Sequence, residues 1–235
     1  KNMSLDGLWR FEPDPNADGE DLGFFKKDHS ARTWSEVKVP GCIHTGRPDL
    51  AYYAGIAWYR RSFVLPFGWA GRRVVLRFEG VNYRARIWIN GVCVGEHHDG
   101  FLPFVFDITE AVDWAGKNVL AVSVDNAHHE GDVPGMHVGW RGDGGILREV
   151  TLSATDFMYV ADQRVVGIPT QHGGDVEIRL HLRNGGATNF DGVAELSVCD
   201  FEGNTCFEWP EQALVLKANE DTEISLNGHV DNALA

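Results

Sequence analysis

The chain has 235 residues, with 21 Lys and Arg against 34 Asp and Glu, and therefore a formal net charge of −13. Such an acidic chain is not expected to bind nucleic acid or an anionic membrane surface through a basic patch. The hydrophobic fraction of 43% and charged fraction of 23% are typical of a folded globular protein, and no apolar run approaches the roughly 18 residues of a membrane span. At about 150 residues per domain, the length predicts one large domain or two modest ones.

Apolar and polar residues alternate with a period of two along most of the chain, which predicts β-strands with one face on a core. The pattern is clear in Val74–Glu79, Ala85–Asn90 and Val176–Asn184. The dipeptide Asn90-Gly91 favours the positive φ angles of a tight hairpin turn. Further strands are expected at Val119–Val124, Arg148–Leu152, Val160–Val166, Val193–Cys199 and Thr222–Leu226.

Helical periodicity is scarce, so the predicted fold class is all-β. Ile108–Ala115 is expected to form a turn or two of helix, and the polar segment Ala17–Lys27 a loop. Strands without intervening helices indicate antiparallel sheets in a sandwich or barrel. A change of texture near residue 156 predicts two domains, residues 1–156 and 157–235, of which the second has about the size of an immunoglobulin-like sandwich.

The four cysteines have no C-x-x-C spacing, which excludes a zinc ribbon or a thioredoxin-like motif. Cys199 and Cys206 flank a predicted turn, so two alternatives stay open for them: a disulfide across a hairpin, or free thiols. The N-terminal residues Lys1–Phe11 contain no apolar stretch that resembles a secretory signal. Together these features lead us to expect a cytoplasmic location.

Seven short motifs follow one another in a characteristic order. They are Leu5–Phe11, Trp34–Gly41, Gly55–Phe63, Phe78–Asn82, Ile87–Gly91, Phe101–Thr109 and Gly144–Val150. In this order they resemble the N-terminal half of glycoside hydrolase family 2, which includes β-galactosidases, β-glucuronidases and β-mannosidases. The resemblance covers essentially the whole chain.

The resemblance implies a fold and a role. Residues 1–156 would form a jelly-roll, galactose-binding-like β-sandwich, called the sugar-binding domain, and residues 157–235 a smaller immunoglobulin-like β-sandwich. In the family a (β/α)₈ barrel follows and performs the chemistry. The chain would then be the non-catalytic front part of a retaining exo-β-glycosidase that hydrolyses O-glycosyl bonds, inactive alone and without a cofactor or metal. Its partners would be its own barrel and a β-linked glycoside at the barrel interface, with self-association into a homo-oligomer as a further alternative.

The resemblance also points to candidate substrate-binding residues. In several family members a loop just before the Gly-Gly-Ile motif reaches the terminal sugar, and the matching stretch here is Met136–Asp143. This stretch departs from the family, because no Asp stands at the usual offset, and packing of its aromatic and basic residues against the barrel is the alternative. The loop after the Asn-Gly hairpin would support the active-site rim. The candidate residues of the two loops are His137, Trp140, Arg141, Asp143, His98 and Asp99.

Other conspicuous residues are given structural interpretations. Asn219-Glu220 matches the family's catalytic Asn-Glu pair, but its polar setting predicts a hairpin turn, so no catalytic glutamate is assigned. The pairs His97-His98 and His128-His129 are expected to be solvated loop residues, because neighbours on a strand point to opposite faces and rarely share one metal ion. Of Arg60 and Arg61, one is expected to face solvent and the other a carboxylate.

The tryptophans leave a competing function open. Trp9, Trp58 and Trp88 are expected in the core or between sheets. Eight tryptophans also offer stacking surfaces, so a free-standing carbohydrate-binding module is the main alternative to the front part of a glycosidase. A purely structural or oligomerisation module is the third hypothesis.

Overall fold

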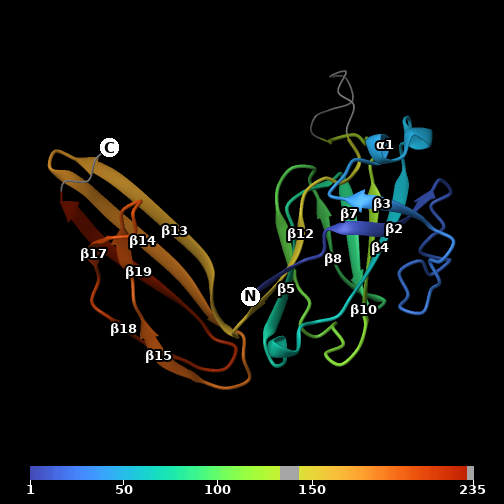
Figure 1. Ribbon diagram of the computed structural model, residues 1–235. Helices are drawn as coiled ribbons and strands as arrows, with labels where there is room; N and C mark the ends of the chain where they lie inside the picture. Colours follow the sequence, from blue (N-terminus) through green and yellow to red (C-terminus); the bar gives the residue numbers. More distant parts are fainter. Residues whose placement is uncertain (133–142, 232–235) are drawn as a thin grey trace. The chain divides into compact units, whose positions relative to one another are not determined.

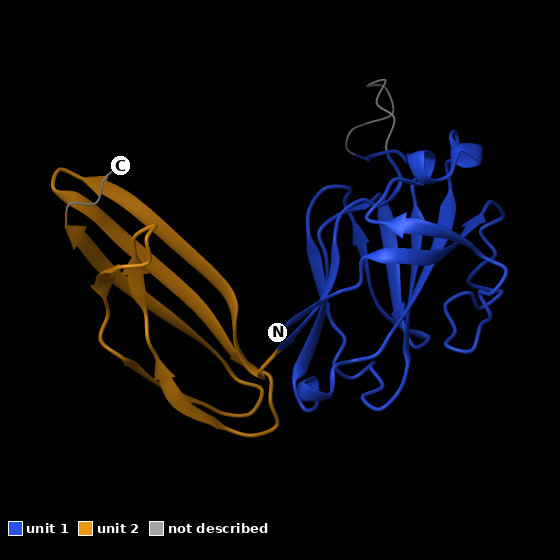
Figure 2. Ribbon diagram, in the orientation of Figure 1, with its two compact units in different colours: residues 1–154 blue, residues 155–235 orange. Residues whose placement is uncertain are grey.

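The computed structural model describes residues 1–132 and 143–231, and the regular secondary structure of these residues is almost entirely β-strand, which confirms the predicted all-β class (Figure 1). The chain divides into two compact units, Lys1–Ala154 and Thr155–Ala235 (Figure 2). The division falls two residues before the domain boundary predicted at residue 156. None of the described helices is long and apolar enough to cross a bilayer.

Unit 1 is a β-sandwich of two main sheets. The larger sheet contains, in spatial order, β3 (Ser35–Val39), β2 (Gly7–Asp14), β4 (Ile56–Phe63), β10 (Asn118–Asp125), β7 (Arg84–Ile89) and β8 (Val92–His98). The smaller sheet contains β1 (Asn2–Ser4), β12 (Val150–Thr155), β5 (Arg73–Phe78) and β9 (Phe104–Asp107). A short third ladder joins β11 (Gly145–Ile146) to β6 (Val81–Asn82).

The main core of unit 1 draws residues from both sheets. Phe11 and Tyr59 of the larger sheet and Leu76 and Phe78 of the smaller one are essentially fully buried in one cluster. Trp9 lies in the same cluster and donates its Nε1–H to the Leu5 carbonyl at 2.9 Å, as a buried indole requires. The prediction that Trp9 is a core residue is confirmed.

A second aromatic cluster lies on the opposite face of the larger sheet. Because side chains alternate along β4, Trp58 points away from the main core that Tyr59 enters. The Trp58 ring stacks on Trp88, with centroids 5.0 Å apart, and Phe24 and Phe25 from the preceding loop cover both rings. The core placement predicted for Trp58 and Trp88 is confirmed, and this face of the sheet is covered by protein.

Helices are few among the described residues: α1 (Ile43–Gly46) and two 3-10 turns, η1 (Pro48–Leu50) and η2 (Phe67–Trp69). The helix predicted at Ile108–Ala115 is wrong; the segment forms a turn. Asn118 explains this outcome, because its side chain accepts the Asp113 N–H and donates to the Asp113 carbonyl, and Asp113 in turn accepts the Ala115 N–H. These side-chain bonds replace the backbone ladder of a helix.

The described residues of unit 2 form three antiparallel sheets. They are β13 (Met158–Thr170), β14 (Gly173–Asn184) and β19 (Asp221–Asp231); β15 (Phe190–Ala194) with β18 (Gln212–Leu216); and β16 (Ser197–Cys199) with β17 (Thr205–Glu208). Leu182 from the first sheet and Leu214 and Leu216 from the second form its buried cluster. This packing of two sheets through leucines makes unit 2 a small sandwich.

Three turn predictions can be compared with the structure. Asn90 and Gly91 have φ angles of 52° and 90° between β7 and β8, which confirms the hairpin. Asn219-Glu220 lies in the turn between β18 and β19, where the Glu220 carboxylate accepts the Lys217 N–H at 2.6 Å, so the turn is also confirmed. The disulfide alternative for Cys199 and Cys206 is not found: an irregularity in the register sets Cys199 opposite Thr205, and both thiols are free.

Candidate functional site

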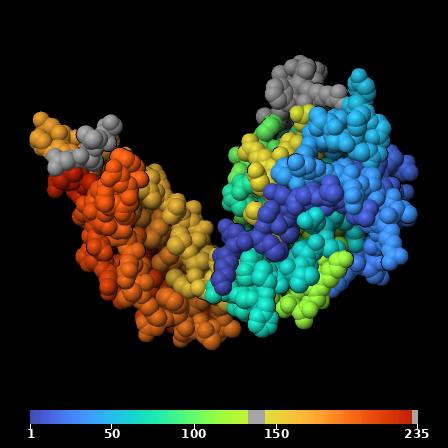
Figure 3. Space-filling model, viewed as in Figure 1, coloured from blue at the N-terminus to red at the C-terminus, as the bar shows by residue number. Residues whose placement is uncertain are grey.

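Three segments distant in sequence meet at one end of unit 1. The Gly144–Val150 motif supplies β11, which pairs with β6. On its other side, Gly41 donates its N–H to the Ile146 carbonyl at 2.8 Å, and Ile43 donates to the Gly144 carbonyl at 2.9 Å. The segment around α1 and the residues after position 142 therefore lie side by side on unit 1, as light blue and yellow surfaces in the space-filling view (Figure 3).

The two glycines of the motif are required by close contacts. A Cβ atom on Gly144 would lie 2.3 Å from the Asn126 Nδ2 atom, and one on Gly145 would lie 2.8 Å from the Tyr59 hydroxyl. Gly145 also has a φ of 125°, which other residues rarely adopt. Asn126 is itself fixed, because it accepts the Gly55 N–H at 2.9 Å and donates to the Tyr53 carbonyl at 3.1 Å. The junction, where β11 meets β6 on one side and the Gly41–Ile43 segment on the other, is thus rigid.

Asn82 connects Asp143 to the second predicted loop. Its amide donates to the Asp143 carbonyl at 2.8 Å. On the other side, its Oδ1 would lie only 2.9 Å from a Cβ on Gly100, so the loop that follows His98, the last residue of β8, packs directly against it. The structure therefore brings Asp143 and the loop of His98 and Asp99 to one neighbour, although 43 residues separate Gly100 from Asp143 in the sequence.

The two predicted residues of this loop have different environments. Asp99 accepts the N–H groups of Phe101 at 2.7 Å and Leu102 at 3.0 Å, and these bonds hold the pKa of its carboxyl below the usual range. Asp99 therefore shapes the loop. The His98 side chain is 61% exposed, and so is Leu102 at the loop tip. His98 is thus accessible to a ligand, whereas the Asp99 carboxylate already has backbone partners.

The other predicted site residues fall in two groups. Asp143 is exposed at the start of the Gly-Gly-Ile motif. His137, Trp140 and Arg141 lie outside the described residues, so their placement stays a prediction.

One histidine differs from expectation. His97 is not a solvated loop residue: its ring stacks on Phe104 with centroids 4.0 Å apart, and burial lowers its pKa. The strand β8 turns this side chain toward the sandwich, while His98 points outward. In the second pair, His129 contacts the Asp125 carboxylate at 3.1 Å through Nε2. Neither pair directs two imidazoles at one point.

Near the junction, Asp132 is a buried carboxylate with charged and polar partners. It pairs with Arg84 and accepts the His129 N–H at 2.7 Å. Burial alone would raise the pKa of Asp132, but the His129 N–H and the Arg84 guanidinium outweigh burial and hold the pKa below its usual range. This pair fixes the backbone just before residue 133.

Replacing Asp132 by asparagine should lower stability in a pH-dependent way. A carboxylate whose pKa is depressed on folding contributes stability that is present above its unfolded pKa of about 3.9 and is lost as pH falls through the lower folded value. The urea midpoints of unit 1 in the two proteins should therefore differ most above about pH 5, and the difference should shrink steadily as pH falls below about 4. A difference that stays constant down to pH 3 would contradict the role given to this ion pair.

Sequence reasoning missed a cluster of possible metal ligands. Cys42 Sγ lies 3.7 Å from His44 Nδ1 and 3.5 Å from Asp143 Oδ1, and these three atoms all lie within 4.8 Å of one another. Cys42 and His44 precede Asp143 by about 100 residues, so no spacing motif reveals the group. A thiol, an imidazole and a carboxylate are the ligand types that zinc prefers in proteins.

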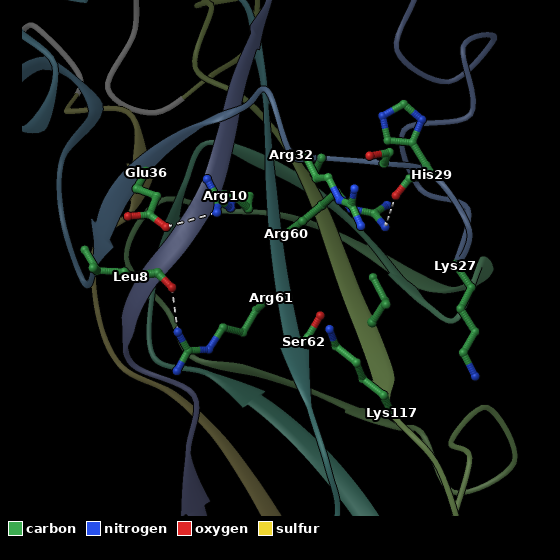
Figure 4. A pocket seen from close by; sticks show the side chains of 13 residues that line it. Leu8, Arg10, Lys27, His29, Arg32, Glu36, Arg60, Arg61, Ser62 and Lys117 are labelled. Atoms are coloured by element: carbon green, nitrogen blue, oxygen red, sulfur yellow. Dashed lines mark hydrogen bonds and ion pairs between the residues drawn. The ribbon is translucent and has the colours of Figure 1, made fainter.

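A cationic groove lies elsewhere on unit 1, with a volume of about 550 Å³ (Figure 4). Its charged lining is Arg10, Lys27, Arg32, Arg60, Arg61, Lys117 and Glu36. Most of these cations are already engaged, since Arg10 pairs with Glu36 at 3.4 Å and Lys27 pairs with Asp113 at 3.1 Å.

The two adjacent arginines of the groove correct a prediction. Within residues 1–132 and 143–231, neither forms an ion pair with a carboxylate: Arg60 donates to the carbonyls of Phe24, Lys26 and His29, and Arg61 to those of Leu8 and Asp6. A guanidinium has five N–H donors, so several carbonyl oxygens can take the place of one carboxylate. This is the case for Arg60, which β4 directs under the loop that contains Phe24 and Lys26. Burial accordingly lowers the pKa of Arg60. Through these bonds, Arg60 holds in place the loop that covers the aromatic cluster.

The chain is similar in sequence to known glycosidases over much of unit 1. Residues 22–156 match the family model described as glycosyl hydrolases family 2, sugar binding domain. A β-galactosidase of Thermoanaerobacter pseudethanolicus is 38% identical over 113 residues, which are 47% of this chain and 15% of that protein. A β-glucuronidase of Bacteroides fragilis is 30% identical over 178 residues, 72% of this chain and 25% of that protein.

Solved structures share the fold over nearly the whole chain. A calcium-binding mutant of Bacteroides uniformis β-glucuronidase 2 superposes with a TM-score of 0.87 at 24% identity, covering 99% of this chain and 28% of that one. A family 2 glycosyl hydrolase from Bacteroides cellulosilyticus superposes with a TM-score of 0.80 at 25% identity, covering 98% and 31%. The chain thus spans about a quarter or less of the two curated relatives above. It belongs to glycoside hydrolase family 2, and residues 22–156 are the family's sugar-binding domain.

Proposed function

We propose that this chain is the non-catalytic N-terminal region of a longer retaining exo-β-glycosidase, in which unit 1 borders the sugar pocket of a following (β/α)₈ barrel. Both named relatives, a β-galactosidase and a β-glucuronidase, extend far beyond the matched region. The described helical elements of this chain are short, and none alternates with parallel strands as a barrel requires. Hydrolysis would therefore depend on two carboxylates located on that barrel.

The observation that carries this proposal is the approach of Asp143 and of the loop after β8 to Asn82. Asp143 and the loop of Asp99 and Gly100 are more than 40 positions apart in the sequence, and both lie beside this one amide. The loop tip exposes Phe101 and Leu102, which are 48% and 61% accessible. Apolar side chains presented beside acidic and imidazole groups suit a surface that another domain covers while polar atoms face a sugar.

Ligand titration separates this role from that of a free-standing carbohydrate-binding module. A pocket that shares its walls with another domain is incomplete in the isolated chain, so calorimetric titration with β-galactosides, β-glucuronides and β-mannosides should give no binding tighter than millimolar. Micromolar affinity would instead support the binding-module hypothesis.

The coding sequence that follows Ala235 provides a second test. It should encode about 250 further residues of alternating strands and helices, with two glutamates placed for retaining hydrolysis. A stop codon directly after this region, in the intact gene, would refute the proposal.

A further inference from the structure

The strongest unassigned feature of unit 1 is the cluster of Cys42, His44 and Asp143. The first two flank the start of α1, and the third begins the strand segment that leads into β11. Backbone bonds between these segments, such as that from Ile43 N–H to the Gly144 carbonyl, fix their separation. The three donor atoms are therefore held together by the fold and do not depend on a chance side-chain rotamer alone.

The imidazole of His44 is oriented for ligation through Nδ1. Its Nε2 lies 3.0 Å from the Tyr53 carbonyl oxygen, which can only accept, and 3.4 Å from the Asn126 Nδ2 atom. The shorter contact, with an acceptor, favours the tautomer that carries its proton on Nε2 and a lone pair on Nδ1. The Asn126 amide donates to the same carbonyl at 3.1 Å and holds it in place. A ligating histidine that donates its second N–H to a backbone carbonyl is the usual outer arrangement of a metal site.

In the tautomer with the proton on Nε2, the Cys42 thiol faces two acceptors. Cys42 Sγ approaches two acceptors, His44 Nδ1 at 3.7 Å and Asp143 Oδ1 at 3.5 Å, but a thiol has a single hydrogen. One acceptor is therefore left without a proton from Cys42. A cation that replaces the thiol proton would bond to all three atoms at once.

The distances match tetrahedral coordination. With bonds of about 2.3 Å to sulfur and about 2.0–2.1 Å to nitrogen or oxygen, neighbouring ligand atoms lie about 3.6 Å apart. The two measured sulfur separations, 3.7 Å and 3.5 Å, agree with this edge length. The distance between the nitrogen and the carboxylate is at most 4.8 Å, against about 3.4 Å in a tetrahedral site, so ligation would require the exposed Asp143 side chain to move slightly toward His44.

We propose that Cys42, His44 and Asp143 bind one Zn²⁺ ion, with a solvent molecule as the fourth ligand on the exposed side. A thiolate and a carboxylate together neutralise the divalent charge, and the thiolate–imidazole set selects zinc over magnesium or calcium, which prefer oxygen. The ion would tie α1 to Asp143, whose carbonyl Asn82 already holds. It would thereby fix the position of a residue at the end of the loop that borders the proposed sugar pocket.

The test uses the whole chain with Cys93, Cys199 and Cys206 replaced by serine, so that Cys42 is the single thiol. All three are exposed, which makes these replacements mild. Titration with Co²⁺ should give one equivalent bound with a thiolate-to-cobalt charge-transfer absorption, and Zn²⁺ should displace it. Zn²⁺ should also raise the melting temperature of this protein. Absence of both the absorption and the stabilisation would overturn the proposal without any ligand variant.

Ligand variants in the same background identify the other two donors. His44→Gln and Asp143→Asn should each weaken Zn²⁺ binding about 10-fold or more, and Cys42→Ser should abolish the charge-transfer band. Circular dichroism checks that each variant is folded. Unchanged Zn²⁺ affinity in Cys42→Ser, or in both other variants, would assign the metal elsewhere and refute the site. These readouts do not involve glycoside hydrolysis, so their failure would leave the proposed function untouched.

Discussion

Replacing Gly145 by alanine is expected to destabilise unit 1 by about 3 kcal/mol, because two penalties combine at this position. The new Cβ would lie 2.8 Å from the Tyr59 hydroxyl and 3.0 Å from the Gly41 carbonyl, and both neighbours belong to the packed interior or the backbone. The φ of 125° is in addition a region that alanine strongly disfavours. Urea unfolding followed by circular dichroism measures the loss.

Gly71 provides a matched control. It also has a positive φ, 72°, but a Cβ there meets no atom within 4 Å. Gly71→Ala should therefore cost only the backbone penalty, about 1 kcal/mol. If the two variants lose equal stability, the close contact at Gly145 contributes nothing and the junction is looser than described.

Replacing Trp58 by alanine should cost about 4 kcal/mol, which makes this the second large effect. The ring stacks on Trp88 and packs edge-on against Phe24, and its Nε1–H donates to the buried Asp14 carboxylate at 3.0 Å. Truncation leaves a cavity beneath the covering loop and deprives Asp14 of a donor. The measurement is again the urea midpoint of unit 1.

Two further variants separate these contributions. Trp114 is 37% exposed and lies outside the aromatic clusters, so Trp114→Ala should change stability by about 0.5 kcal/mol or less. Trp58→Phe keeps an aromatic ring but loses the hydrogen bond and should fall between the two. A loss at Trp114 as large as that at Trp58 would show that the aromatic cluster is not what holds the covering loop.

The parts of the fold that depend on neighbouring residues were predictable from the sequence. Alternation over Val74–Glu79 and Ala85–Asn90 marks β5 and β7, because the period of two directly reflects strand geometry. The Asn90-Gly91 hairpin follows equally from local backbone preferences. The failure at Ile108–Ala115 has a distant cause: Asn118, beyond the end of that segment, supplies the competing hydrogen bonds.

The candidate site was predictable only in part, since its geometry arises from long-range contacts. The family resemblance directed attention to His98, Asp99 and Asp143. Asp143 and the loop of Asp99 and Gly100 do meet at Asn82. Asn82 ends one of the seven motifs, but nothing in the local sequence marks it as the residue where these segments meet, or reveals the approach of Cys42 to Asp143. Likewise, strand alternation set Arg60 and Arg61 on opposite faces, but carbonyl partners such as those of Lys26 and Asp6 come from loops whose paths only the folded chain defines.

The most direct test of the central claim is the rate at which the purified chain hydrolyses 4-nitrophenyl β-glycosides. If the reacting carboxylates belong to a separate barrel, galactoside, glucuronide and mannoside substrates should all remain at the uncatalysed rate, whatever the protein concentration. Turnover proportional to chain concentration, and abolished by Glu220→Gln or by another single carboxylate replacement in this chain, would place the chemistry on these two sandwiches and contradict the account.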